Sequence, residues 1–128
     1  MASKFQLITE LYSSTLLRVT ASHERWTGFL RAACYNYKCS FDEQILIYAQ
    51  RPDATAVLQL DDWNKMFGRW VNKGATGIAV FDDASGRGRL KYYFDISDTH
   101  ETWRSRRPVP IWEMKPEYVP DVIETLES

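Results

Sequence analysis

The sequence predicts an α+β fold in which helices come first, followed by a small antiparallel β-sheet of three or four strands and a short C-terminal helix. In the first half, apolar residues recur at intervals of three and four, the spacing of one buried helix face. After residue 54, short runs of β-branched and aromatic residues alternate with glycine-containing turns, which is typical of strands. Since 128 residues match the usual size of one domain, we expect a single domain over residues 1–128.

Two helices are expected at the start of the chain. Residues 4–19 carry one apolar stripe, made of Phe5, Leu7, Ile8, Leu11, Tyr12, Leu16 and Leu17. Ser22 is a suitable N-cap for the second helix, and Glu24 in its first turn favours the helix dipole. We expect this second helix to end near Lys38.

A third helix is expected over residues 41–50. Ser40 and Glu43 have the spacing of a capping box, in which each side chain accepts a hydrogen bond from the other residue's backbone N–H. Pro52 disfavours helical geometry at Arg51, so we expect the helix to end there.

The strands of the predicted sheet follow. Residues 54–60 form a short aliphatic run, and residues 91–96 form an aromatic one. Between them, residues 70–71 and 78–81 flank the turn-forming stretch 72–77, whose glycines permit positive φ. We therefore expect 70–71 and 78–81 to pair as a hairpin, with 91–96 as the third strand of a meander.

Another short helix is expected between the first two strands. Asp61 or Asp62 would cap it and Gly68 would end it. No regular pattern is visible over residues 98–110, and residues 116–126 are expected to form the C-terminal helix with Pro120 in its first turn. The short helix carries Trp63, Met66 and Phe67, and we expect Trp63 to lie in the core, with base stacking as the alternative.

The charge of the chain is unevenly distributed. The formal net charge is −1, but residues 69–107 contain eight basic and five acidic residues, a net +3. Residues 108–128 carry a net −4, and residues 1–68 balance at zero. A basic centre is compatible with an anionic partner, although solvated surface charge explains the same pattern.

Several classes of protein find no support in the sequence. No apolar run is long enough for a membrane span and no secretory signal is visible, so we expect a cytoplasmic protein without a membrane partner. Cys34 and Cys39 are expected to be free thiols, and His23 and His100 lie in no metal-binding motif. No phosphate-binding glycine motif precedes a helix. We therefore expect no catalytic residues, no metal, no cofactor and no enzymatic activity.

Aromatic residues interleaved with basic ones are the remaining functional signal. They occur at residues 67–70, 91–93 and 103–104. Flat rings beside cations suit single-stranded nucleic acid, since unpaired bases stack on rings and each nucleotide carries a phosphate. The alternative is that these rings fill the core, as aromatics on strands usually do.

The stretch from Tyr37 to Ile78 resembles a known family. Its elements are Ser40, Leu46-Ile47, Gln50, Pro52, Ala54-Thr55, Trp63, Gly68-Arg69, Val71, Lys73-Gly74 and Gly77-Ile78. This pattern is similar to the N-terminal single-stranded-DNA-binding domain of ArdC-type antirestriction proteins and of LtrC-like proteins of conjugative elements. Residues 91–97 and 112–114 resemble the opening domain of large helicase- and methylase-bearing proteins of such elements.

Two features depart from this family. Asp42-Glu43 stand in the third helix where the family usually has asparagine, and carboxylates there would repel a phosphate backbone. The HExxH segment of the protease-like domain that follows in ArdC-type proteins is also missing. We therefore expect Glu43 to be a capping residue, and the chain to be a stand-alone variant or an excised domain.

The resemblance and the local chemistry together select candidate DNA-binding residues. Arg69 and Lys73 are the first choices for phosphate contacts, because strand alternation places 69, 71 and 73 on one face of the expected hairpin. Trp70, Tyr92 and Tyr93 are stacking candidates, and one of the two tyrosines must differ from the other in exposure because they lie on opposite strand faces. The complete set is Gln50, Thr55, Arg69, Trp70, Lys73, Lys91, Tyr92, Tyr93, Arg104, Arg106 and Arg107.

These observations predict a protein that binds single-stranded DNA with little sequence preference. By the resemblance, it would serve a mobile element in conjugative transfer or antirestriction, with a host defence or conjugation protein as a further partner. The alternative is a protein-interaction module that inhibits a host defence nuclease, with the acidic residues 108–128 as its contact surface. A nuclease or methyltransferase is the third hypothesis.

Overall fold

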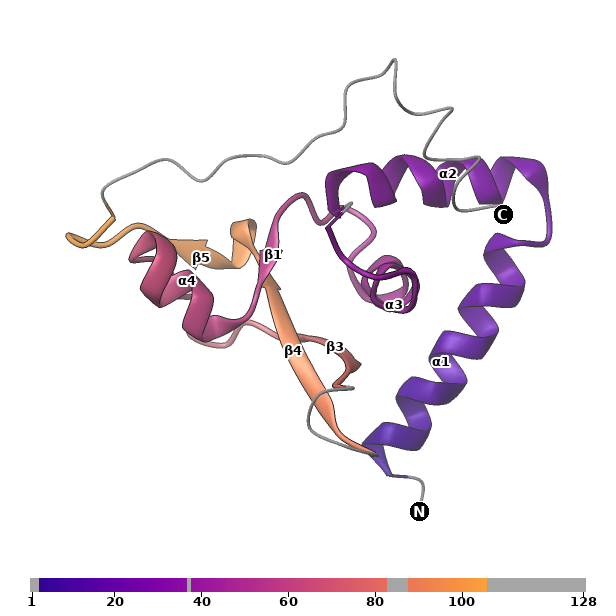
Figure 1. The fold of residues 1–128 in the computed structure, drawn as a ribbon, viewed down its shortest axis with the longest axis horizontal. Helices are drawn as coiled ribbons and strands as arrows, with labels where there is room; N and C mark the ends of the chain where they lie inside the picture. The colour runs from indigo at the N-terminus through magenta and orange to yellow at the C-terminus, as the bar shows by residue number, and fades with distance from the viewer. Residues whose placement is uncertain (1–2, 37, 83–87, 106–128) are drawn as a thin grey trace.

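The computed structural model describes residues 3–36, 38–82 and 88–105 and confirms the α+β class with helices first (Figure 1). The C-terminal helix expected at 116–126 lies outside the described residues. The elements in chain order are α1 (Lys4–Val19), α2 (His23–Ala33), the 3₁₀ turn η1 (Cys34–Asn36), α3 (Phe41–Gln50), β1 (Val57–Leu58), α4 (Leu60–Phe67), β2 (Trp70–Val71), β3 (Ile78–Phe81), β4 (Leu90–Asp95), the 3₁₀ turn η2 (Ile96–Asp98) and β5 (Thr99–His100).

The second and third helices begin where their capping residues predict. The Ser22 hydroxyl accepts a hydrogen bond from the Arg25 N–H at 3.1 Å and caps α2. The expected capping box of α3 is present: the Glu43 carboxylate accepts from the Ser40 N–H at 2.9 Å, and the Ser40 hydroxyl accepts from the Glu43 N–H at 3.3 Å. The second helix ends at Ala33, earlier than the expected Lys38, and continues as η1.

The short helix α4 differs at its start from the prediction. It begins at Leu60 with Gln59 as N-cap, no side chain caps it, and both predicted caps, Asp61 and Asp62, lie in its first turn. Its end agrees with the prediction, because Gly68 adopts φ 62° as the left-handed C-cap.

The sheet connectivity corrects the expected hairpin. In the three-stranded antiparallel sheet the order is β1-β4-β3, and β2 pairs instead with β5 in a separate two-stranded ribbon. Trp70 lies opposite His100, and Val71 lies opposite Thr99. The predicted pairing of β2 with β3 was wrong. After the turn that follows β2, Gly77 packs against Tyr92 of β4, and β3 pairs with β4 instead.

The strands also differ in length from the prediction. The first strand spans only Val57–Leu58 rather than residues 54–60, because the carboxylate of Asp95 accepts hydrogen bonds from the backbone N–H groups of Thr55 and Ala56. The strand β5 falls in the region where the sequence shows no regular pattern.

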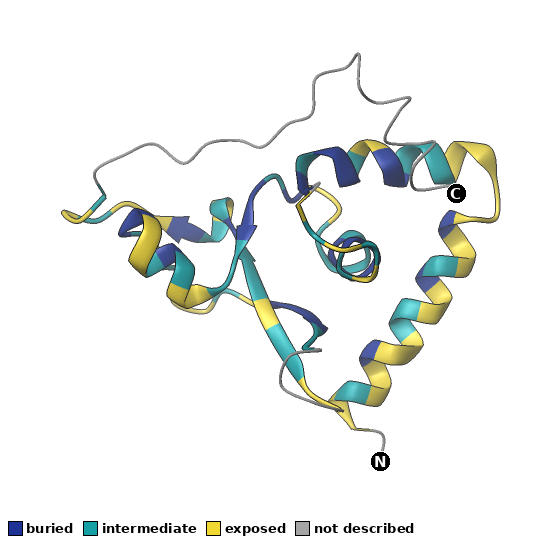
Figure 2. Ribbon diagram, viewed as in Figure 1, coloured by how far each residue is buried: buried dark blue, intermediate teal, exposed yellow. Residues whose placement is uncertain are grey.

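The elements pack as a layer of helices against one face of the sheet and a smaller unit on the other. Figure 1 shows α3 end-on between α1, α2 and the sheet, with α4 and β5 on the other side of β4. Three groups of buried side chains hold these layers together, and Figure 2 shows buried and exposed positions interspersed along the helices. Trp63 is fully buried in the group beneath α4, where its Nε1–H donates to the Phe94 carbonyl at 2.8 Å. The expected core role of Trp63 is therefore confirmed.

Candidate nucleic-acid interface

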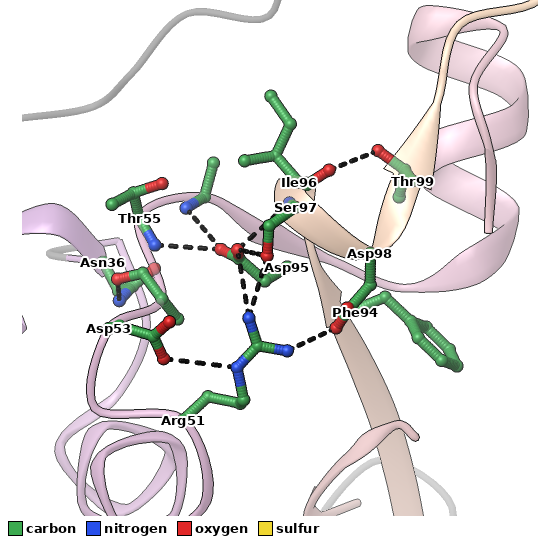
Figure 3. A network of polar contacts seen from close by, with 12 residues as sticks. Asn36, Arg51, Asp53, Thr55, Phe94, Asp95, Ile96, Ser97, Asp98 and Thr99 are labelled. Atoms are coloured by element: carbon green, nitrogen blue, oxygen red, sulfur yellow. Dashed lines mark hydrogen bonds and ion pairs between the residues drawn. The ribbon is translucent and has the colours of Figure 1, made fainter. Parts of the chain in front are cut away.

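A polar network joins the end of α3 to the turn that leads into β5 (Figure 3). Arg51, just after α3, donates from one terminal nitrogen to Asp98 at 2.5 Å and from the other to the Ser97 hydroxyl at 2.8 Å. Its Nε contacts the exposed carboxylate of Asp53 at 3.3 Å. Because Asp98 precedes β5 directly, the guanidinium fixes the start of that strand.

Asp95 is the buried centre of this network. Its Oδ1 accepts from the backbone N–H groups of Thr55 at 2.9 Å and Ala56 at 3.1 Å, and its Oδ2 accepts from the Ser97 hydroxyl at 2.6 Å and the Ser97 N–H at 3.1 Å. Burial alone would raise the pKa of this carboxyl, but these hydrogen bonds to the charged form lower its pKa below the usual value. The predicted DNA contact Thr55 thus contributes its backbone N–H to a structural network.

The side chain of Gln50, another predicted DNA contact, binds the backbone of β3. Its Nε2 donates to the Ala79 carbonyl at 2.8 Å and its Oε1 accepts from the Ala79 N–H at 3.0 Å. Since β3 is an edge strand of the sheet, this amide pairs backbone groups that another chain would otherwise bind. Gln50 is therefore occupied in joining α3 to the sheet.

Arg69 lies on the inner face of the β2–β5 ribbon. Its Nε donates to the Thr99 hydroxyl at 2.8 Å and one terminal nitrogen donates to the Thr99 carbonyl at 3.2 Å. The other terminal nitrogen lies 3.7 Å from Glu101, and only 14% of the side chain is exposed. Val71, on the same face, packs against the buried group around Trp63. The face on which we expected a groove for DNA therefore holds the ribbon against α4.

The opposite face of the ribbon is open to solvent. Trp70 and His100 lie directly opposite each other in the pairing, so their side chains share this face, and Asn72 follows two residues after Trp70. All three residues are exposed, and His100 Nδ1 lies 2.7 Å from Asn72 Oδ1. Lys73 is exposed at the turn that follows.

The segment after β5 carries two further exposed residues, Trp103 and Arg104. The hydroxyls of Thr102 and Ser105 both donate to the Gly68 carbonyl, the latter at 3.1 Å. These bonds hold the segment against the C-cap of α4, and Trp103 between the two hydroxyl residues is 80% exposed. The Arg104 guanidinium lies 4.8 Å from the centre of the Trp103 ring. We refer to the exposed residues of the ribbon, of the turn after it and of the segment after β5 as the ribbon face: Trp70, Asn72, Lys73, His100, Trp103 and Arg104.

The candidates on β4 lie on two different faces. Lys91 and Tyr93 point to α3, where Lys91 Nζ lies 3.3 Å from a Glu43 oxygen and the Tyr93 hydroxyl donates to the same carboxylate. Burial, followed by the bond to Glu43, raises the pKa of Tyr93. Tyr92 is more exposed, at 37%, with Lys4 Nζ 4.9 Å from its ring centre. The expected difference between the two tyrosines is thus confirmed.

The structure therefore separates the predicted residues into groups. Trp70, Lys73 and Arg104 are exposed residues of the ribbon face, and the 72–77 loop leads from the ribbon to Tyr92. Arg106 and Arg107 lie outside the described residues. The residues of the surface that sequence reasoning did not select are Asn72, His100 and Trp103. Trp103 had a signal, its adjacent arginine, whereas Asn72 and His100 become neighbours only through the long-range pairing of β2 with β5.

Among residues 3–36, 38–82 and 88–105, no set of three or more histidine, cysteine or acidic side chains is placed to hold a metal ion. None of the helices in this part of the chain combines the length and the apolar composition that crossing a membrane requires. Comparison with protein-family models, curated proteins and solved structures found no match for the chain.

Proposed function

We propose that the protein binds single-stranded DNA through the ribbon face, with little sequence preference, in the service of a mobile genetic element during conjugative transfer or antirestriction. The observation that carries this proposal is the pair of exposed indoles, Trp70 and Trp103, which are 45% and 80% exposed. The Arg104 guanidinium lies 4.8 Å from the Trp103 ring centre, and Lys73 is exposed at the turn that follows Trp70. Large rings are usually buried, and an exposed pair next to cations is the arrangement that single strands bind.

The chemistry of the ribbon face favours unpaired bases. Stacking of a base on an aromatic ring contributes about 1–3 kcal/mol, and every base has a face that can stack. In a duplex these faces are covered by neighbouring base pairs, so the indoles have access to them only in a single strand. Lys73 and Arg104 supply positive charge for the phosphates on either side.

Low sequence preference follows from the polar groups of this surface. Asn72 and His100 carry the groups best suited to reading base edges, but Asn72 Oδ1 and His100 Nδ1 are engaged with each other. Stacking and phosphate contacts then supply most of the affinity, and neither depends on base identity.

Fluorescence anisotropy with labelled oligonucleotides tests the proposal. We expect binding to a single strand that exceeds binding to the matching duplex, and a linear decrease of log affinity with log salt. Trp70→Ala with Trp103→Ala should weaken binding at least tenfold, since about 1–3 kcal/mol of stacking is lost per base. Lys73→Gln with Arg104→Gln should reduce the salt slope by about 0.7 for each phosphate that the protein no longer neutralises.

Matched control variants distinguish binding at the ribbon face from nonspecific effects of charge and of exposed apolar surface. Leu17→Ala removes a side chain that is 73% exposed on α1, and Arg31→Gln removes an exposed cation from α2. Both should leave affinity and salt slope unchanged. Equal losses in the control and ribbon-face variants, or no binding to single strands, would reject the proposal and favour the protein-interaction alternative.

A further inference from the structure

A surface hollow of about 390 Å³ lies between the end of α1, the start of α2 and the side of α3. In Figure 1 this corner is at the opposite end of the molecule from α4 and β5, which carry the ribbon face. The residues that line the hollow are Arg18, Val19, Glu24, Arg25, Gly28 and Tyr48. The proposed DNA-binding surface uses none of them.

Two cations on different helices border this hollow. Arg18 is in the last turn of α1, and Arg25 is in the first turns of α2. Among the described residues, neither guanidinium has a carboxylate within ion-pair distance or a hydrogen-bond acceptor. Glu24 is the one carboxylate in the lining, so the lining carries a net charge of +1.

The start of α2 also carries backbone donors next to the lining residue Glu24. The N-cap Ser22 accepts from the N–H of Arg25, which leaves the N–H groups of His23 and Glu24 at the start of α2 without an acceptor in the described part of the chain. The positive end of this helix thus adds to the two guanidinium charges.

Tyr48 and Gly28 form the apolar side of the hollow. The Tyr48 ring is held edge-on against Phe29, with ring centres 5.5 Å apart at 83°. Its hydroxyl oxygen would lie 3.8 Å from a Cβ on Gly28, and within the described residues it has no hydrogen-bond partner. A phenol donor beside an open glycine surface can receive both an anion and the organic group attached to it.

We propose that this hollow binds a phosphomonoester dianion, with Arg18, Arg25 and the Tyr48 hydroxyl contacting its oxygens. A tetrahedral group presents oxygens to two separate guanidiniums at once, whereas a planar carboxylate is matched by one guanidinium fork. The net charge of +1 in the lining attracts a dianion about twice as strongly as a monoanion at the same distance, because the Coulomb energy scales with the charge of the ligand. The same chemistry occurs at the 5′-phosphate end of a DNA strand and in a free nucleoside monophosphate.

Amide and arginine Nε–H chemical shifts of the ¹⁵N-labelled full chain test this site. Inorganic phosphate and thymidine 5′-monophosphate should shift the Gly28 amide and the Arg18 and Arg25 Nε–H signals in a saturable manner. Arg18→Gln with Arg25→Gln should weaken binding at least tenfold, because charge-assisted hydrogen bonds are removed. Glu24→Gln should strengthen it, and Arg31→Gln, an exposed arginine of α2 outside the lining, should have no effect.

Oligonucleotides that differ only in a 5′-phosphate or 5′-hydroxyl identify the source of the group. If the phosphorylated strand binds more tightly and the Arg18→Gln, Arg25→Gln variant abolishes this difference, the site binds DNA ends. If both strands bind equally while the monophosphate binds saturably, the site binds free phosphomonoesters. Absence of saturable shifts with every phosphate probe, or equal shifts with acetate, overturns the proposal. Trp70→Ala with Trp103→Ala should leave monophosphate binding intact, so the proposal for this site is tested independently of the proposal for the ribbon face.

Discussion

Replacing Asp95 with asparagine should destabilise the fold severely, although the two side chains have nearly the same shape. The carboxylate is 2% exposed and accepts four hydrogen bonds, two at each oxygen. An amide keeps one accepting oxygen and turns an NH₂ group toward two of the donors. With about 1.5–3 kcal/mol for each hydrogen bond to a charged group, the loss of two predicts destabilisation by about 3 kcal/mol or more.

Urea unfolding followed by circular dichroism measures this loss, and Asp53→Asn is its matched control. Asp53 contacts the same guanidinium of Arg51 at 3.3 Å, but its side chain is 75% exposed, so its removal should cost less than about 1 kcal/mol. Asp95→Asn also removes the longer ion pair between Asp95 and Arg51 at 3.7 Å, but Arg51 keeps its closer partner Asp98 at 2.5 Å, so most of the difference reports on the buried acceptor. A loss at Asp95 no greater than at Asp53 would refute the reasoning.

The same pair of variants predicts a pH dependence. The pKa of Asp95 is lowered in the folded state, so its contribution is fully present above the unfolded pKa of about 3.9 and is lost as pH falls through the folded pKa. The stability gap between the native sequence and Asp95→Asn should therefore be constant from neutral pH to about pH 5 and narrow below pH 4. The pKa of Glu43 is also lowered, but that carboxyl is present in both proteins and cancels. A gap that widens on acidification would contradict the assignment.

The local geometry at two glycines and one cysteine leads to three further predictions. Gly68→Ala should destabilise the fold by about 1–3 kcal/mol and weaken DNA binding, because φ is 62° and a Cβ would lie 2.5 Å from the Arg104 carbonyl oxygen. Thermal melting and fluorescence anisotropy measure the two effects, and an unchanged melting temperature would contradict the prediction. Gly28→Ala should raise stability by up to about 1 kcal/mol in urea unfolding, because the new Cβ meets the Tyr48 hydroxyl at an ordinary 3.8 Å; a loss of stability would show that α2 is strained there. Burial raises the pKa of the Cys39 thiol to about 12, so iodoacetamide at pH 8.5 should modify this thiol at least about tenfold more slowly in the folded protein than in the urea-unfolded chain. Mass spectrometry measures the two rates, and equal rates would contradict the burial of Cys39.

The helical half of the fold was predictable because its signals are local. The capping box at Ser40 and Glu43, the stop at Pro52 and the left-handed C-cap at Gly68 each act within a few residues, and all three are found. The caps proposed for α4 were the exception, since Asp61 and Asp62 lie too late to cap a helix that begins at Leu60.

The ribbon was not predictable because its strands are far apart in sequence. Trp70 and His100 are thirty positions apart, and each contributes to a strand of only two residues. A strand of two residues is too short to show alternation of apolar and polar side chains. From sequence alone, the glycine-containing turn between residues 71 and 78 favours pairing of the two strands that flank it. The pairing that occurs instead is selected by tertiary contacts, above all by the bonds from Arg69 to Thr99 and from Arg51 to Asp98.

This reversal of pairing decides which side chains are available for a ligand. Side chains do alternate between the two faces along β2, as predicted. Because β5 is the partner strand, however, the face of Arg69 turns inward and the face of Trp70 turns outward. A positioning role for Arg69 has a distinct consequence, since Arg69→Lys retains the charge but removes the two-nitrogen contact to Thr99. It should therefore lower stability and weaken DNA binding while leaving the salt slope unchanged, whereas Lys73→Gln should lower the salt slope with little effect on stability. A reduced slope in Arg69→Lys at unchanged stability would return this arginine to the phosphate contacts.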